Sequence, residues 1–231
     1  MYPTATLVAE PLLALPPPRY VRDSLVGPRL VEADARLRPT LESFIARRYE
    51  QIHRARLRHF LPRLFGAVDA GGALVAAYGV RVANDGPLFL EQYLDTPIEV
   101  CALARFGRRA PRSHIVEIGN LAGATPGALR SLIPAVTAWL LAEGHEFVAF
   151  TGAAPLRNAF GRLGLPLCEL AAARIECLPE EQRADWGQYY AMNPAVMLGD
   201  IGAGRRLLSA DAASPRDLRA RLAPLAMVGA P

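Results

Sequence analysis

The stretch that decides the fold is Ile115–Gly123, IVEIGNLAG. It begins as an apolar strand with one carboxylate, Glu117, and it ends in Asn-Leu-Ala-Gly, with a glycine on either side of this Asn-Leu-Ala run. A Thr-Pro pair follows and predicts the start of a helix, and a second apolar strand lies at His145–Thr151. Strand, small-residue turn, helix and strand form a βαβ unit, which binds ligands at the carboxyl ends of its strands. We therefore expect the chemistry of this protein beside Ile115–Gly123.

The flanking segments predict a mixed sheet. In chain order we first expect a helix capped by Thr40 and running to about residue 58, a hairpin of strands 64–68 and 74–81, and a helix at about 97–107. The βαβ unit follows, with its helix capped by Thr125 and ended by Gly144. A helix at 155–163 and closing strands at 167–170 and 173–178 come last, the two strands as a hairpin or one bent strand. This order indicates an α/β (α+β) mixed sheet with one parallel pair in its middle, and not a doubly wound fold.

Composition fits one globular domain with tails. The chain has 231 residues, of which 52% are apolar and 21% charged. We divide it into a Pro/Ala-rich arm at 1–38, a domain at 39–200 and an Arg/Ala/Pro-rich tail at 201–231 with a helix at 215–222. The longest apolar run, Leu132–Ala142, is too short to cross a bilayer. No basic region precedes the apolar residues of the N-terminus, so we expect no signal peptide and a cytoplasmic location.

The net charge is +4, and every basic residue is arginine. This pattern reflects either codon bias in a GC-rich genome or arginines that clamp phosphate or carboxylate groups. Aromatic residues do not interleave with the basic runs, which argues against a nucleic-acid groove. The three cysteines lack CxxC spacing, and His53 and His59 are six residues apart, so neither a disulfide framework nor a metal site is expected.

A short polar cluster stands out at residues 88–95, LFLEQYLD. On a strand, Glu91, Tyr93 and Asp95 would share one face because side chains alternate with period two. That face is either solvated or lines a pocket.

Four further segments carry a resemblance to a known family. They are GPLFLEQYLDTPIE (Gly86–Glu99), HIVEIGNLAG (His114–Gly123), FTGAAPLRNAFGRLGLP (Phe150–Pro166) and WGQYY (Trp186–Tyr190). They resemble the bacterial family named thermostable hemolysin. The element order is similar to that of the GNAT (Gcn5-related N-acetyltransferase) fold and of the acyl-homoserine-lactone synthases that share it. The resemblance implies a central parallel strand pair splayed by a bulge, with an acyl thioester lying in the gap.

The resemblance also implies an N-acyltransferase that moves an acyl group from acyl-CoA, or from the acyl-phosphopantetheine of an acyl carrier protein, to an amine or amino-acid-like acceptor. Glu117 would be the base, and Asn120 would orient the thioester or its oxyanion. Strict alternation places these two on opposite faces, and a bulge at Gly119 would bring them together. The simpler alternatives are a buried acid paired with an arginine and an asparagine that forms a turn.

The remaining candidate residues follow from the same picture. Glu91 and Tyr93 are further catalytic candidates; the substrate-binding candidates are Gln92, Asp95, Gly119, Leu121, Thr151 and Asn158; and the candidates for the phosphate of the donor are Gly123, Thr125, Gly127 and Arg130.

One departure bears on the donor. Acetyl-CoA-dependent members of this fold carry an Arg/Gln-x-x-Gly-x-Gly/Ala turn, whereas here Pro126 removes one backbone donor. The departure favours an acyl carrier protein or a noncanonical donor, and an Arg-rich surface with Arg105, Arg108, Arg109 and Arg112 would suit an acidic carrier. No tightly bound cofactor is expected, and the sequence indicates no oligomeric state. Two other hypotheses stay open: a membrane-active protein, as the family name suggests, and a non-catalytic relative of the fold.

Overall fold

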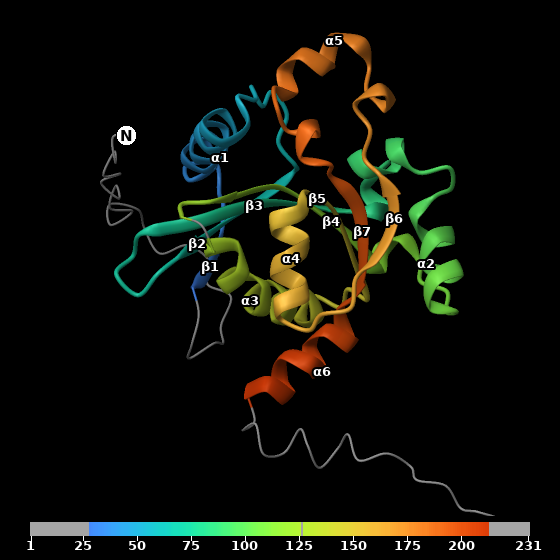
Figure 1. Ribbon diagram of the computed structural model, residues 1–231. Coiled ribbons are helices and arrows are strands. Elements are labelled where there is room, and N and C mark those ends of the chain that lie inside the picture. Colours follow the sequence, from blue (N-terminus) through green and yellow to red (C-terminus); the bar gives the residue numbers. More distant parts are fainter. Residues whose placement is uncertain (1–27, 126, 213–231) are drawn as a thin grey trace, which may run out of the picture.

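A computed structural model describes residues 28–125 and 127–212. Its centre is a seven-stranded sheet with the order β1-β2-β3-β4-β5-β7-β6 (Figure 1). The strands are β1 (Arg29–Glu32), β2 (Arg63–Val68), β3 (Leu74–Val82), β4 (Ile115–Gly123), β5 (Phe147–Gly152), β6 (Cys168–Ala172) and β7 (Ala195–Asp200). β4 and β5 run parallel, and every other neighbouring pair is antiparallel. The predicted mixed sheet with one central parallel pair is confirmed.

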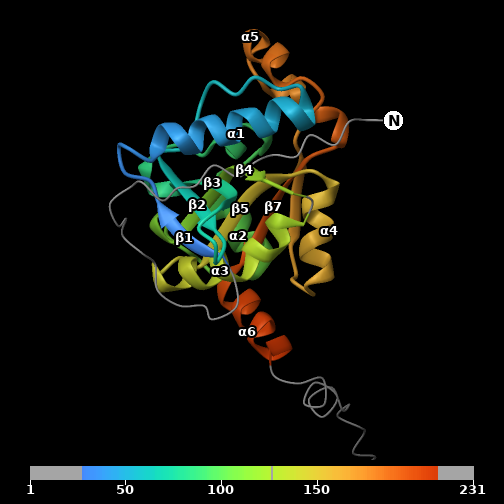
Figure 2. The same cartoon turned by 90° about the vertical axis from the view of Figure 1, so that its left-hand side faces the viewer.

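Helices cover both faces of this sheet. They are α1 (Arg38–His53), α2 (Ile98–Phe106), α3 (Ala128–Ala142), α4 (Ala154–Arg162), the short α5 (Glu180–Arg183) and α6 (Ile201–Ala212). Alternate residues of β4 face opposite layers: Val116 and Ile118 pack in the cluster that contains α3, and Ile115 packs with α2. α1 and α3 lie on opposite sides of the sheet (Figure 2). Glu117, which has the same parity as Ile115, therefore faces the α1 and α2 layer.

The parallel pair parts at the carboxyl ends of its strands. The β4–β5 register ends at Ile118↔Phe150, while β4 continues beside β3 to Gly123 and β5 continues beside β7 to Gly152. On its other side β4 carries one extra residue, because Gly79 faces Gly119 but Ala77 faces Ala122. The predicted splay is therefore present. The left-handed residue of the bulge is Asn120, with φ of 51°, and not Gly119.

Two predicted helix starts are wrong. Thr40 lies inside α1, whose N-cap is Leu37, and the carboxylate of Asp34 accepts the N–H groups of Arg36 and Leu37. α1 also ends earlier than predicted, at His53. Likewise α3 begins after Gly127, which has φ of 92°, and not at Thr125. In both cases the chain enters the helix through a turn that the cap preferences of single residues do not reveal.

The closing strands also differ from the prediction. β6 pairs with β7, and the segment expected to be its partner forms a 3₁₀ turn at Ile175–Cys177. The sequence did not predict β1, β7 or α6. β1 lies within the predicted arm, whereas α6 lies within the predicted tail and contributes Ile201 to the main core. The helix predicted at 215–222 lies outside the described residues.

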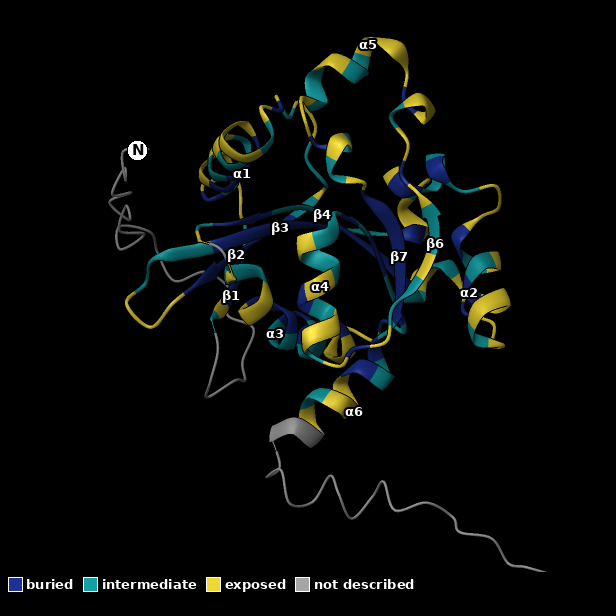
Figure 3. Cartoon of the chain, in the orientation of Figure 1, coloured by how far each residue is buried: buried dark blue, intermediate teal, exposed yellow. Residues whose placement is uncertain are grey.

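The core follows the central strands, which are buried along most of their length (Figure 3). Trp186, Tyr189 and Tyr190 pack back onto the domain, as predicted for the aromatic segment. Among the described residues, no helix combines the length and apolar character needed to cross a membrane.

Candidate functional site

Glu117 is the buried acid of the molecule's central strand. Its side chain lies in a layer of apolar residues, and the residue is 3% exposed. The carboxylate accepts the N–H groups of Phe89 and Leu90 at 2.8 and 3.1 Å. Burial raises its pKa to about 7, although both N–H groups and nearby Arg81 favour the charged form. Glu117 therefore exchanges a proton near neutral pH, as a general base must.

Beside Glu117 lies a cavity of about 350 Å³, which we call the Glu117 cavity. Its floor comes from the splayed part of β4 and from Thr151 on β5. Six Phe, Tyr and Trp side chains and several charged ones complete the wall: Tyr49, Phe60, Phe89, Tyr93, Trp186 and Tyr189, with Arg56, Arg58, Arg81 and Asp185. A buried base thus opens onto a space large enough for a small molecule.

Asn120 reaches the same cavity as Glu117, and so do the substrate-binding candidates Gly119 and Leu121. Because the bulge lies between Gly119 and Ala122, both polar residues face one cavity, as the sequence predicted. The amide of Asn120 is already engaged, however. Its Oδ1 accepts the N–H of Leu61 at 2.8 Å, and its Nδ2 donates to the carbonyl of His59 at 3.3 Å. Asn120 therefore fastens the α1–β2 connection to β4.

This geometry gives a first prediction. Asn120→Gly keeps the left-handed backbone but removes both side-chain hydrogen bonds, so we expect a loss of about 1 kcal/mol in the free energy of unfolding. Asn120→Asp keeps the oxygen that accepts from Leu61 and should lose less. Urea denaturation of the two variants measures the difference. Equal stability of Asn120→Gly and the wild type would contradict the fastening role.

The predicted polar cluster at residues 88–95 does not form a strand. Phe89–Tyr93 is a 3₁₀ turn, so the expectation that Glu91, Tyr93 and Asp95 share one strand face is wrong. Of these three residues only Tyr93 lines the Glu117 cavity, and its hydroxyl is hydrogen-bonded to that of Tyr190 at 2.5 Å. Glu91 and Asp95 line a separate, shallow hollow. Gln92 folds back and donates to the carbonyl of Phe89.

Glu91 is occupied by its own neighbours. Its carboxylate accepts the N–H groups of Leu88 and Ile98 and two bonds, at 2.7 and 2.9 Å, from the guanidinium of Arg112. The bonds from Arg112 are the largest influence and lower the pKa of Glu91 to about 2. The structure thus places Glu91 as an anchor of the 3₁₀ turn that is charged at neutral pH, away from the cavity that holds Glu117.

A second cavity, of about 670 Å³, opens where β4 and β5 have parted. We call it the arginine cavity, because Arg48, Arg130 and Arg162 line it. All four residues predicted for the donor phosphate line it too: Gly123, Thr125, Gly127 and Arg130. The two cavities share Tyr49, Leu121, Thr151 and Tyr189, so they meet at the gap between the strands. Asn158 is exposed and lines neither cavity.

Sequence reasoning missed Arg48 and Arg162. Arg48 donates from Nε to the carbonyl of Gly123 at 2.8 Å, which fixes the end of α1 against the end of β4. Nothing in the helical spacing distinguishes Arg48 from Arg47, so only the packing of α1 on the sheet identifies it.

A third, small cavity of about 50 Å³ lies on the α3 and α4 side of the gap. Its lining is apolar apart from Tyr78 and Thr137, and it shares Leu121, Leu129 and Leu156 with the arginine cavity. An apolar group that entered through the gap would be enclosed here.

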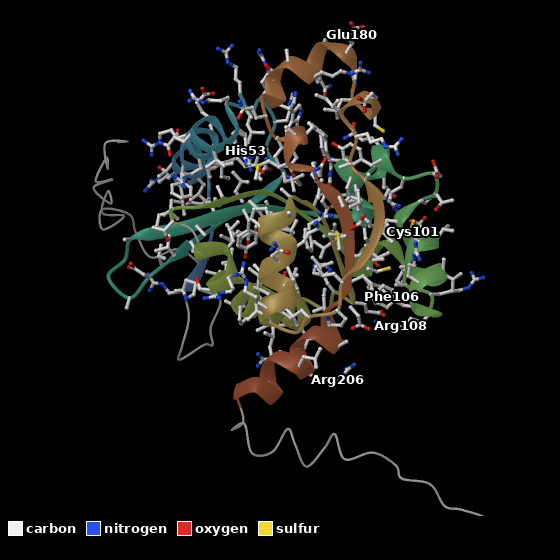
Figure 4. All side chains as sticks on the ribbon, viewed as in Figure 1. His53, Cys101, Phe106, Arg108, Glu180 and Arg206 are labelled. Atoms are coloured by element: carbon white, nitrogen blue, oxygen red, sulfur yellow. The ribbon has the colours of Figure 1, made fainter. Side chains whose placement is uncertain are left out.

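The cysteines and the arginines of the predicted carrier surface line none of these three cavities. The described residues contain no group of three or more His, Cys, Asp or Glu side chains placed to hold a metal ion. Cys101, Cys168 and Cys177 are free thiols, and Cys101 lies on α2, across the molecule from His53 at the end of α1 (Figure 4). Two arginines of the predicted carrier surface are engaged: Arg108 pairs with Glu146 and Asp200, and Arg112 with Glu91 and Glu99.

A model of the family described as thermostable hemolysin matches residues 31–205, which include both cavities and all the strands except the first two residues of β1. The chain belongs to the thermostable hemolysin family. No curated protein matches this member of the family.

Several solved structures are similar to this member of the family. FeeM, an N-acyl amino acid synthase from uncultured soil microbes, has a TM-score of 0.56 and 15% identity, covering 81% of this chain and 99% of its own. The acyl-homoserine-lactone synthase LasI has a TM-score of 0.49 and 10% identity, over 76% and 91% of the two chains. A GCN5-related N-acetyltransferase from Kribbella flavida has a TM-score of 0.46 and 13% identity, over 77% and 99%. The likeness to FeeM shows a GNAT-like fold.

Proposed function

We propose that this protein is an N-acyltransferase that moves an acyl group from a thioester to an amine. The observation that carries the proposal is Glu117. It is a buried carboxylate with a pKa of about 7, and it lies where two parallel strands part and two cavities meet. The fold shared with FeeM, which is an N-acyl amino acid synthase, supports the same chemistry.

Glu117 would remove a proton from the acceptor. In its ionised form the carboxylate takes one proton as the amine nitrogen bonds to the thioester carbonyl carbon. The carbon–sulfur bond then breaks, and the thiolate leaves as a thiol by taking up the proton that Glu117 accepted, which restores the ionised carboxylate. Because the side-chain amide of Asn120 is engaged, we assign the oxyanion to a backbone N–H of the bulge. Asn120 and Leu121 have no register partner on β3 or β5.

The donor would lie in the arginine cavity. Its three guanidinium groups fit a phosphate, and the gap leads from there to Glu117. The acyl chain would enter the apolar cavity past Leu129 and Leu156. A phosphopantetheine phosphate is common to CoA and to acyl carrier proteins, so this site serves either donor. The turn with Pro126 favours the carrier protein.

Removing Arg130 should weaken donor binding. We expect Arg130→Ala to raise KM for an acyl-CoA or acyl-carrier donor roughly 10-fold, the size of losing one charge-assisted hydrogen bond. KM for the N-acetylcysteamine thioester, which has no phosphate, should not change. Arg47→Ala is the matched control, since Arg47 is an exposed residue of α1 that lines neither cavity. An equal effect on both kinds of donor would contradict the phosphate assignment.

The proposed activity itself is tested by intact-mass analysis. The protein is offered acyl-CoA and acyl-carrier thioesters of several chain lengths together with pooled amino acids and amines. Acylated acceptors that form with the wild type and not with Glu117→Gln would support the proposal. Dye release from liposomes by the protein without any thioester would instead favour direct membrane action.

A further inference from the structure

Arg81 stands out among the charged residues of the Glu117 cavity. It lies on β3 directly opposite Glu117 in the β3–β4 register, and it lines the same cavity. Residues opposite one another in antiparallel strands carry their side chains on the same face, with Cβ atoms roughly 5 Å apart. The register therefore places a carboxylate and a guanidinium side by side on the cavity wall.

The two charges do not form an ion pair. Arg81 appears in none of the ion pairs of the described residues. Among the described residues, the side chain of Arg81 makes one hydrogen bond, from Nη1 to the carbonyl of Pro87 at 3.2 Å. Its Nε is buried and has no partner there. A guanidinium has five N–H donors. Most of the capacity of Arg81 to bind a carboxylate is therefore unused.

Both charged groups are held by the same short segment. Pro87 accepts from Arg81, while Phe89 and Leu90 donate to Glu117. The segment 87–90 thus holds the guanidinium and the carboxylate on the same cavity wall without an ion pair between them. A ligand that carries a positive and a negative group close together has the complementary arrangement of charges.

The other two arginines of the cavity are less suited to this task. Arg58 is paired with Asp185 through two hydrogen bonds. Arg56 is exposed at the cavity rim, where solvent and salt screen its charge. Aromatic rings, among them Phe89 and Trp186, supply an apolar wall for the rest of a ligand.

We propose that the acceptor is an α-amino acid whose carboxylate binds Arg81 while its amine faces Glu117. The proposal rests on the proposed acyl transfer and specifies the acceptor of that reaction. Arg81 is then a specificity-determining residue. It makes the enzyme prefer an amino acid to the amine that lacks its carboxylate.

The test compares L-phenylalanine with 2-phenylethylamine, which differ by the carboxylate alone. We expect the wild type to prefer phenylalanine, and Arg81→Gln to raise KM for phenylalanine roughly 10- to 100-fold while leaving 2-phenylethylamine unaffected. Arg47→Gln makes the same charge change on the exposed side of α1, outside both cavities, and should alter neither acceptor. Arg81→Lys keeps the charge without the fork and should lie between the wild type and Arg81→Gln; it carries the test if Arg81→Gln does not fold.

Two results would overturn the proposal and leave acyl transfer standing: equal use of both acceptors by the wild type, or an equal loss with both acceptors in folded Arg81 variants. If the wild type acylated neither these acceptors nor the pooled amino acids and amines with any donor, the proposed function would fail, and the role of Arg81 with it.

Discussion

Glu117→Gln is expected to lower kcat for acyl transfer by roughly 10²- to 10⁴-fold, the range that a general base contributes. The substitution keeps the size of the side chain and one oxygen that can accept from Phe89 or Leu90. It removes the group that takes the proton. KM for the donor should change little, since the arginine cavity lies on the other side of the gap.

The pH profile gives this prediction a second readout. Only ionised Glu117 can accept a proton, and its pKa of about 7 lies above the ordinary value of 4.5. The rate should therefore rise with pH through an apparent pKa near 7 and level off above it. Asp185→Asn is the matched control. It also removes a carboxylate from the Glu117 cavity, but Asp185 is paired with Arg58 and has a lowered pKa. A rate that stayed flat from pH 5 to pH 9 would disprove the base assignment.

The same pKa sets a dependence of stability on pH. Because the folded protein binds the Glu117 proton more tightly than the unfolded chain does, this group stabilises the fold most below pH 4.5. Its contribution falls as the pH rises to about 7. Keeping Glu117 ionised above pH 7 therefore costs stability.

The sequence was sufficient to predict the centre of the fold and to single out Glu117 as the acid to examine there. IVEIGNLAG reads as a buried strand with a single acid, and a lone acid in such a strand is either paired or functional. The extra residue of the bulge was placed one position early. Glycine was the expected position for a bulge, whereas an asparagine with φ of 51° occupies it, held by Leu61 and His59 from the α1–β2 connection. A local sequence pattern cannot reveal contacts made by residues about 60 positions away along the chain.

Long-range contacts also explain the other differences. Arg81 lies in an ordinary apolar hairpin strand, and only the register with β4 places it opposite Glu117. The sequence allowed a strand for the polar cluster at residues 88–95, yet Phe89–Tyr93 is a 3₁₀ turn, and Arg112 and the N–H groups of Leu88 and Ile98 hold Glu91 there. Propensity in short segments is readily overridden by such tertiary contacts.

Arg112→Met is expected to produce the largest loss of stability among these variants. It leaves the carboxylate of Glu91, whose side chain is 15% exposed, without its cation. It also removes bonds to Glu99 and to the carbonyls of Ala83 and Gly86. For a partly buried pair of this kind we expect a loss of about 2 kcal/mol in the free energy of unfolding, measured by urea denaturation at pH 7.

Acid should remove the same stabilisation. The pKa of Glu91 is about 2 in the fold against an ordinary 4.5, so the contribution is complete above pH 4.5 and is lost as the pH falls towards 2. The difference between the wild type and Arg112→Met should shrink over that interval. Glu42→Gln serves as control, because its i,i+4 pair with Arg38 on α1 is more exposed than the carboxylate of Glu91, with side chains 33% and 32% exposed, and its loss should cost less than about 0.5 kcal/mol. A constant difference between pH 7 and pH 3 would show that the Glu91 charge is not its source.

The double variant Glu91→Gln/Arg112→Met connects this anchor to catalysis. It removes both charges, so it should be more stable than Arg112→Met alone, and a double-mutant cycle gives the coupling between them. The turn held by Glu91 also supplies the Phe89 and Leu90 N–H groups that favour ionised Glu117. Arg112→Met, which loosens the turn, should therefore shift the pH–rate profile to higher pH. An unchanged profile in destabilised Arg112→Met would separate the anchor from the base and limit Arg112 to holding the fold.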